Sequence, residues 1–199
     1  MERMFPINEN TPELKFASIA LDVWSALDKI ERTGWVMRGV KNPETVQSHT
    51  VSLRNIAASI LELKDEEREG LLDMLEVHDW PEVINGDEVI LSVDEEELKT
   101  LKASKFEKEQ IALTSICEKL EEKGKEIVDL WLRFETSNDP AAVFARQLDK
   151  YQAIEQALEY EKEQGIPLFK ELLDYSRRNI NHPVLLDRIK RLEEEFLRL

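Results

Sequence analysis

The sequence predicts an all-α fold, and three observations carry that prediction. Apolar residues recur at three- and four-residue steps over most of the 199-residue chain, which is the period of helices with one buried face. Valine-rich alternating runs, which are typical of strands, are scarce. The chain has only 6 glycines, and no repeat or linker interrupts the helical pattern. At this length a single core buries most of the apolar surface, so we expect one domain over residues 1–199.

The first half of the chain is expected to contain helices joined by loops. Pro43, with Asn42 as the cap before it, marks the start of the second helix because proline fits the first helical position. Asp65 is the expected cap of the third helix, and Pro81 stops it because proline has no N–H to donate. The expected helices cover residues 13–30, 43–63 and 66–79, with loops at 31–42 and 80–90.

The second half is expected to be helical almost throughout. Acidic residues at 94–97 open a short helix, since negative charge stabilises a helix N-terminus. Gly124 is expected to separate two helices, and Asp139 followed by Pro140 repeats the cap-plus-proline signal before a long helix. The helices expected after the acidic one cover residues 105–123, 126–135, 140–164, 168–178 and 183–199.

Composition and charge limit the classes of partner and compartment. The net charge is −15, so the surface repels polyanions and we expect no nucleic-acid polymer as a partner. No apolar run approaches the roughly 18 residues of a membrane span, and the N-terminus lacks the apolar stretch of a signal peptide, so no membrane partner is expected. Cys117 is the sole cysteine and lies on an apolar helical stripe, which predicts a core position. These features suit a reducing, cytoplasmic location.

Polar side chains fall on inward-facing positions of three expected helices, namely His49, the adjacent His78 and Asp79, and Asp149. A buried carboxylate needs a partner, and a metal or another charged group is the usual one. Each residue alone has a simpler interpretation, as a hydrogen-bonded core histidine or an acid paired at the rim of the core. Together, two imidazoles and two carboxylates suit one octahedral divalent ion, such as Mn²⁺, Co²⁺, Fe²⁺ or Ni²⁺, with Mg²⁺ as an alternative.

Two further acids, Glu82 and Asp87, follow this His-Asp pair on the expected loop. Four protein ligands leave about two positions of an octahedral ion for water and a substrate oxygen. Such an ion acidifies the water and polarises a phosphoryl oxygen. Glu82 and Asp87 are the residue types that orient water and protonate a leaving alkoxide, and one of them must then hold its proton near neutral pH. We therefore expect them to form the catalytic pair.

The sequence resembles the HD-domain metal-dependent phosphohydrolases at these residues. His49, His78 with Asp79, and Asp149 reproduce the H…HD…D order of that superfamily. Longer strings resemble its 5′-deoxynucleotidase branch, namely RTGWVMRGV at 32–40, PETVQSH at 43–49, HDWPEVINGD at 78–87, LDK at 148–150 and ALEYE at 157–161. The resemblance covers about residues 14–165 and leaves residues 166–199 as an additional C-terminal helical segment.

The resemblance implies an all-α HD fold that hydrolyses deoxyribonucleoside 5′-monophosphates to nucleoside and phosphate. It implies one metal ion and homodimers, which are common in the family. The ligands and the acid/base pair it implies are His49, His78, Asp79 and Asp149, and Glu82 with Asp87.

The resemblance also suggests residues that contact the substrate. Trp35 matches the tryptophan that crowds the 2′ position of the sugar and disfavours ribonucleotides. Some members carry a basic residue just before this tryptophan that helps to hold the phosphate, whereas this chain has Gly34 there. Arg38 is the expected replacement. Other candidates for this role are Lys41, Arg146 and Lys150.

Two alternatives use the same residues. The chain could be an HD phosphohydrolase that acts on another nucleotide or a different phosphomonoester. It could also be a catalytically idle HD domain that serves as a binding module. An idle relative is free to lose a metal ligand, and none of the expected ligands is missing here, which favours hydrolysis.

Overall fold

The computed structural model describes residues 12–60, 62–90 and 94–199, and their regular structure is helical apart from one isolated bridge between Glu31 and Thr45. The all-α prediction is confirmed. No helix in these ranges is both long and apolar enough to cross a membrane. The α-helices are α1 (Leu21–Leu27), α2 (Thr33–Val36), α3 (Val46–Ser59), α4 (Asp65–Arg68), α5 (Leu71–Val77), α6 (Glu82–Asn85), α7 (Glu95–Cys117), α8 (Glu121–Thr136), α9 (Pro140–Gln164), α10 (Phe169–Ser176) and α11 (Pro183–Phe196).

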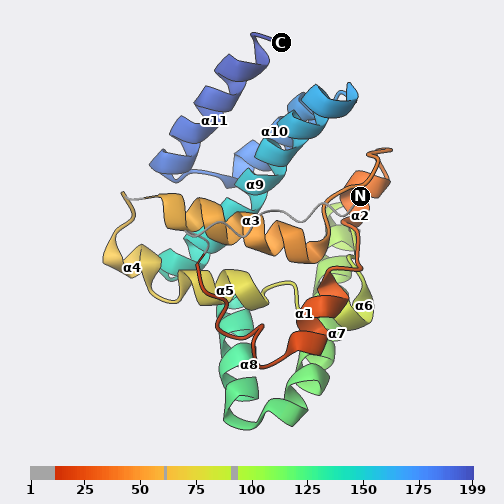
Figure 1. Ribbon diagram of the computed structural model, residues 1–199, viewed down its shortest axis with the longest axis vertical. Coiled ribbons are helices and arrows are strands. Elements are labelled where there is room, and N and C mark those ends of the chain that lie inside the picture. The colour runs from red at the N-terminus through yellow and green to blue at the C-terminus, as the bar shows by residue number, and fades with distance from the viewer. Residues whose placement is uncertain (1–11, 61, 91–93) are drawn as a thin grey trace.

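The helices are arranged around α9, which passes behind α3 in Figure 1. Helices α3 and α5 cross the middle of the molecule, the α7–α8 hairpin lies at one end, and α10 and α11 lie at the other. One hydrophobic cluster joins α3, α5 and α9 to the C-terminal helices, so that Leu185 and Ile189 share a core with Leu53 and Leu148. A second cluster joins α1 to α7 and α8 and includes Cys117, as predicted.

The segments predicted as loops each contain a single helical turn, α2 and α6. The start of α3 also differs from the prediction. Asn42 has a left-handed backbone (φ 50°) and is not the cap. Thr45 caps α3 instead, because its side chain accepts the N–H of Ser48 while the Ser48 hydroxyl accepts the N–H of Thr45. Pro43 therefore lies before the helix.

Two glycines change the predicted helix boundaries. The helix predicted over residues 66–79 is broken at Glu69, whose backbone is extended, and at Gly70, whose φ of 70° is left-handed and which precedes α5. Asp65 is the first helical residue there and not the cap, which is Lys64. Gly124 does not end a helix but lies within α8, where a Cβ would stand 2.2 Å from the carbonyl oxygen of Cys117. Glycine is needed at residue 124 for this close approach of two chain segments.

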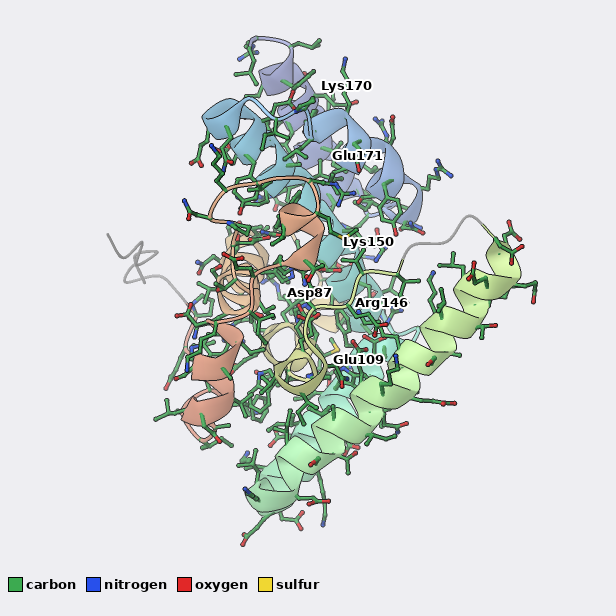
Figure 2. All side chains as sticks on the ribbon, turned by 90° about the vertical axis from the view of Figure 1, so that its right-hand side faces the viewer. Asp87, Glu109, Arg146, Lys150, Lys170 and Glu171 are labelled. Atoms are coloured by element: carbon green, nitrogen blue, oxygen red, sulfur yellow. The ribbon has the colours of Figure 1, made fainter. Side chains whose placement is uncertain are left out.

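The acidic segment and the helix predicted after it are one continuous helix, α7. Asp94 caps it by accepting the N–H of Glu97. No glycine or proline lies between residues 94 and 117, so nothing in the local sequence breaks the helix. The first turns of α7 project from the body of the molecule in Figure 2, and a later part of the helix carries Glu109, which is labelled near Arg146.

Buried Glu76 on α5 fixes the segment before α1. Its carboxylate accepts the backbone N–H groups of Lys15, Phe16 and Ala17 at 2.7–2.8 Å and pairs with buried Arg54 at 3.0 Å. We expect Glu76→Ala to lower the free energy of unfolding by about 3–5 kcal/mol, because it leaves the buried Arg54 guanidinium without its carboxylate and three N–H groups without their acceptor. Urea denaturation measures this, with Asp73→Ala at a partly exposed position of α5 as the control. A loss below about 1 kcal/mol would contradict this role.

Candidate metal centre and active site

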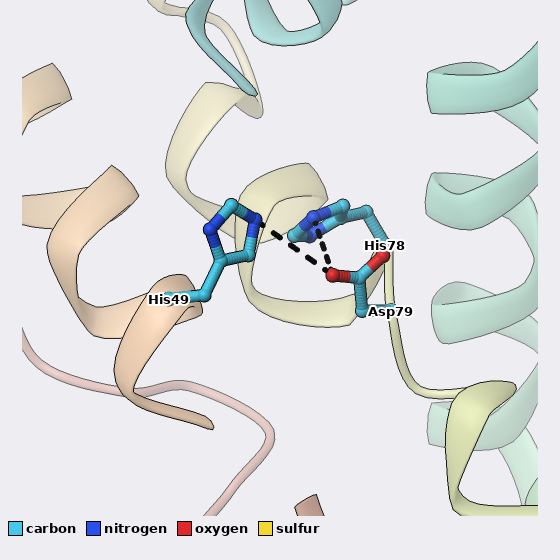
Figure 3. A group of neighbouring side chains, drawn as sticks. All are labelled: His49, His78 and Asp79. Carbon is cyan, nitrogen blue, oxygen red and sulfur yellow. Dashed lines mark ion pairs between the residues drawn. The ribbon is translucent and has the colours of Figure 1, made fainter. Parts of the chain in front are cut away.

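The predicted metal ligands meet at the point where α3, the end of α5 and α9 converge. His49 lies on α3, His78 and Asp79 directly follow α5, and Asp149 lies on α9. Figure 3 shows both imidazole rings turned toward the Asp79 carboxylate. Asp79 Oδ2 lies 3.1 Å from His78 Nε2 and 3.8 Å from His49 Nε2. Asp149 Oδ1 lies 3.2 Å from His49 Nε2, so the structure brings all four residues together.

The hydrogen bonds of the two imidazoles aim their Nε2 lone pairs at this point. His49 Nδ1 lies 2.9 Å from the side-chain oxygen of Gln152, and His78 Nδ1 lies 2.9 Å from the carbonyl oxygen of Leu75. An oxygen that only accepts places the proton on Nδ1 and leaves Nε2 as an electron-pair donor. Both Nε2 atoms are buried without a hydrogen-bond partner among the described residues.

This arrangement fits a metal ion. Two nitrogen lone pairs and one carboxylate oxygen, from His49, His78 and Asp79, lie within 4.8 Å of one another. Such a set of electron-pair donors repels itself unless a cation lies between them. Imidazole and carboxylate together suit first-row divalent ions. A bound cation therefore explains why both Nε2 atoms are buried without a hydrogen bond. A histidine that is only part of the core would have its nitrogens hydrogen-bonded.

Trp35 lies in the layer behind His49. Its indole N–H donates to Glu44 Oε1 at 2.9 Å, and Glu44 Oε2 accepts the side-chain amide of Gln152 at 2.9 Å. Gln152 in turn contacts His49 Nδ1, so a buried chain of hydrogen bonds leads from the tryptophan to an expected metal ligand. Trp35 also packs edge-to-face on Tyr160 and is not among the residues that line the cavity described next.

A cavity of about 450 Å³ is lined by three of the four predicted ligands, His78, Asp79 and Asp149. Glu82 and Asp87 line it, and their side chains are 3% and 8% exposed. Arg32 holds this acidic wall together, because its guanidinium lies 3.0 Å from Asp79, 3.9 Å from Glu82 and 3.8 Å from Asp87. Asp87 also accepts the backbone N–H of Thr33 at 2.6 Å, which joins the wall to the start of α2.

The environment separates the pKa values of these carboxyl groups. Burial alone would raise the pKa of Asp79, but its contact with His78 and the charge of Arg32 outweigh it and hold this pKa below its usual range. The pKa of Asp149 is lowered in the same way, chiefly by His49. Burial and then the charge of Asp79 raise the pKa of Glu82 well above its ordinary value. Glu82 is therefore the acid in this wall that is suited to carry a proton.

Arg38, the predicted phosphate contact, is engaged elsewhere. Its guanidinium pairs with Glu171 of α10 at 2.6 Å and donates to the carbonyl oxygen of Gly34 at 2.8 Å. It is not among the residues that line the cavity. The structure thus brings Glu82 and Asp87 to the predicted ligands and does not bring Arg38 or Trp35 into the cavity wall.

Several cavity residues were not singled out from the sequence. Arg32 stands in a string shared with the family, but its charge lies in a loop where no period predicts a direction. Lys105, Glu109 and Glu135 lie on α7 and α8 among many charged residues, and their sequence carries no signal that separates them from a solvated face. Burial, opposed by the nearby Lys105, raises the pKa of Glu109 to about 7.

Comparison with known proteins identifies the family. The HD-domain profile matches residues 25–182 of this chain. The chain belongs to the HD-domain family. It is 34% identical over 174 residues to the zebrafish (Danio rerio) protein named 5′-deoxynucleotidase HDDC2, covering 86% of this chain and 84% of the relative. It is 32% identical to the human (Homo sapiens) HDDC2 protein, covering 85% of this chain and 80% of the relative.

A solved structure supports the fold of this HD domain independently. A crystal structure of a Pyrococcus horikoshii protein superposes with a TM-score of 0.62 at 22% identity, covering 88% of this chain and 97% of that one. At this identity the likeness concerns the fold alone. The predicted resemblance to the 5′-deoxynucleotidase branch of the HD superfamily is confirmed by the relatives above. The HD domain also implies a divalent metal ion, which agrees with the grouping of His49, His78 and Asp79.

Proposed function

We propose that this HD domain is a metal-dependent phosphomonoesterase that hydrolyses deoxyribonucleoside 5′-monophosphates to deoxynucleoside and phosphate. The observation that carries the proposal is the pair of orphaned imidazole nitrogens, His49 Nε2 and His78 Nε2, which face two carboxylates beside a cavity. That cavity also holds a buried acid with a raised pKa, Glu82. The relatives named 5′-deoxynucleotidases supply the substrate class.

The metal site in this proposal consists of His49, His78, Asp79 and Asp149. A divalent ion held there supplies Lewis acidity toward a phosphoryl oxygen and acidifies water. The proposed ion is Mn²⁺, Co²⁺, Fe²⁺ or Ni²⁺, with Mg²⁺ as an alternative, since a mixed imidazole and carboxylate set suits all of these better than a structural zinc.

The two acids beyond the ligands have different proposed roles. Glu82 is protonated before the reaction and donates this proton to the 5′-oxygen of the leaving nucleoside. Asp87 orients the attacking water, since Arg32 and the N–H of Thr33 hold its carboxylate in a fixed direction. The role proposed for Trp35 in disfavouring a 2′-hydroxyl is supported by the family resemblance, and its indole is held behind His49 by the hydrogen bond to Glu44.

Further parts of the proposal concern the whole molecule. The chain forms one domain, because the additional helices α10 and α11 pack into the same hydrophobic cluster as α3 and α9. The part that resembles the HD family covers about residues 14–165. The resemblance to the family supports a homodimer. The single, buried cysteine suits a reducing cytoplasm.

Phosphate release from dAMP and AMP, measured side by side, tests the proposed function. We expect release from dAMP well above release from AMP in Mn²⁺ or Co²⁺, and none in EDTA. The sugar preference follows from the role given to Trp35, and the EDTA result follows from the metal centre. Equal release from both nucleotides would remove the sugar discrimination and keep the hydrolase. No release from any nucleotide or phosphomonoester, with metal bound, would overturn the proposal.

A further inference from the structure

The cavity must accept a doubly charged phosphate next to an acidic wall. The acids that line it are Asp79, Glu82, Asp87, Glu88, Glu109, Glu135 and Asp149. The cations that line it are Arg32, Lys102, Lys105, Arg146 and Lys150. A metal ion offsets part of the acidic charge, but a phosphate is also held by charged donors of the protein. The question is which of these cations is free to do so.

Three of the cations are already engaged. Arg32 pairs with Asp79 at 3.0 Å and lies near the two proposed catalytic acids. Arg146 donates to the carbonyl oxygens of Phe134 and Ser137 at the end of α8, so its guanidinium fixes α9 to α8. Lys105 donates to the carbonyl oxygen of Glu88 at 3.0 Å and pairs with Glu109 at 3.4 Å. Moving any of them to a phosphate breaks an existing contact.

The other two cations, Lys102 and Lys150, have no hydrogen bond or ion pair with any residue that the structure describes. They differ in position. Lys102 is exposed on the first half of α7, which projects from the body of the molecule. Lys150 is half-buried and stands on α9 directly after the predicted ligand Asp149. Figure 2 shows Lys150 on the same face as Asp87, Glu109 and Arg146.

The position of Lys150 on α9 places its ammonium close to the metal centre. Its charge is one of the causes that lower the pKa of Asp149, so the two side chains interact electrostatically although no ion pair forms between them. A phosphate whose oxygen meets an ion at Asp149 therefore presents its other oxygens within the field of Lys150. A lysine ammonium serves well here because it binds phosphate as a point charge with freely rotating donors.

We propose that Lys150 holds the phosphate of the substrate and takes the place that Arg38 was expected to fill. This inference rests on the proposed function, because it concerns the phosphate of the same substrate. It makes Lys150 a binding residue for the phosphate dianion, which the substrate and the inorganic product share. The nucleoside part of the substrate does not contact it.

The test compares Lys150→Met with Lys150→Arg, Lys102→Met and a matched control, Lys170→Met. Lys170 is an exposed lysine of α10, outside the cavity and labelled in Figure 2, so its substitution changes the net charge equally. Calorimetry measures the binding of inorganic phosphate to the Mn²⁺-loaded full chain. Steady-state kinetics measure KM and kcat for dAMP, and inhibition by phosphate and by deoxyadenosine.

We expect Lys150→Met to weaken phosphate binding by about 10- to 100-fold, the loss of a charge-assisted hydrogen bond. KM for dAMP rises in proportion, inhibition by deoxyadenosine stays the same, and Lys150→Arg recovers most of the affinity. Lys170→Met behaves as the unsubstituted chain. Unchanged phosphate affinity in Lys150→Met, or a loss confined to Lys102→Met, would overturn the assignment. A chain that binds phosphate through Lys150 but hydrolyses nothing would instead overturn the proposed function.

Discussion

Asp79→Ala is expected to abolish both metal binding and phosphate release. Asp79 is the carboxylate that both orphaned imidazole nitrogens face, at 3.1 and 3.8 Å. The substitution removes a ligand and a negative charge together. It also removes the acid that lies nearest the Arg32 guanidinium, at 3.0 Å, and leaves that cation beside the site with only Glu82 and Asp87 at 3.8–3.9 Å. A metal ion would then meet two neutral imidazoles, the Asp149 carboxylate alone and a nearby positive charge that is less well neutralised.

The measurement is metal content per chain after dialysis against Mn²⁺ or Co²⁺, together with phosphate release from dAMP. Asp73→Ala is the matched control, because Asp73 lies on α5, which ends just before His78 and Asp79, and pairs only with exposed Lys15 in the described structure. It should keep both metal and activity. Circular dichroism shows whether each variant remains helical. Full metal occupancy in a folded Asp79→Ala protein would exclude Asp79 as a ligand and move the site elsewhere.

A long helix such as α9 follows from the sequence because its apolar period is sustained over several turns, whereas the helix predicted over residues 13–30 is present only as α1 (Leu21–Leu27). Helix α9 begins at Pro140 and ends at Gln164 as the cap, the proline and Gly165 predict. Single turns such as α2 and α6 contain four residues each, which is about one helical period, so no periodic pattern can reveal them. Gly124 misleads for a related reason, because its role is a contact with Cys117 that lies outside its local sequence.

The same distinction between periodic helices and other segments decides which residues of the candidate site could be predicted. His49 and Asp149 could be predicted because each polar residue interrupts an apolar stripe whose direction the helical period fixes. Arg32 and Glu44 could not, because both lie in non-helical segments whose side-chain directions depend on tertiary packing. Arg38 shows that residue type alone does not identify a phosphate contact. Its charge is suitable, but it pairs with Glu171, which is distant in the sequence.

Glu82→Gln is expected to keep the metal ion and to lower kcat by about 10²- to 10⁴-fold, the usual loss when a general acid is removed. Glu82 is buried beside Asp79 and Asp87, and these surroundings raise its pKa well above the ordinary value. A group with a raised pKa is protonated at lower pH and loses its proton as the pH rises through that pKa. The unsubstituted protein should therefore lose kcat on the alkaline side, as Glu82 becomes a carboxylate that has no proton to donate.

The pH profile separates this role from a structural one. Glutamine has the shape of a protonated glutamate but cannot give up a proton in this range, so Glu82→Gln should be slow at every pH and lack the alkaline limb that Glu82 causes. Glu88→Gln is the matched control, since Glu88 lies on the same wall but is exposed and pairs with Lys108. It should keep both kcat and the limb. Loss of metal in Glu82→Gln would instead make Glu82 a ligand or the support of one, and an unchanged alkaline limb would assign the proton to another group of the cavity, of which Glu109 is the first to test.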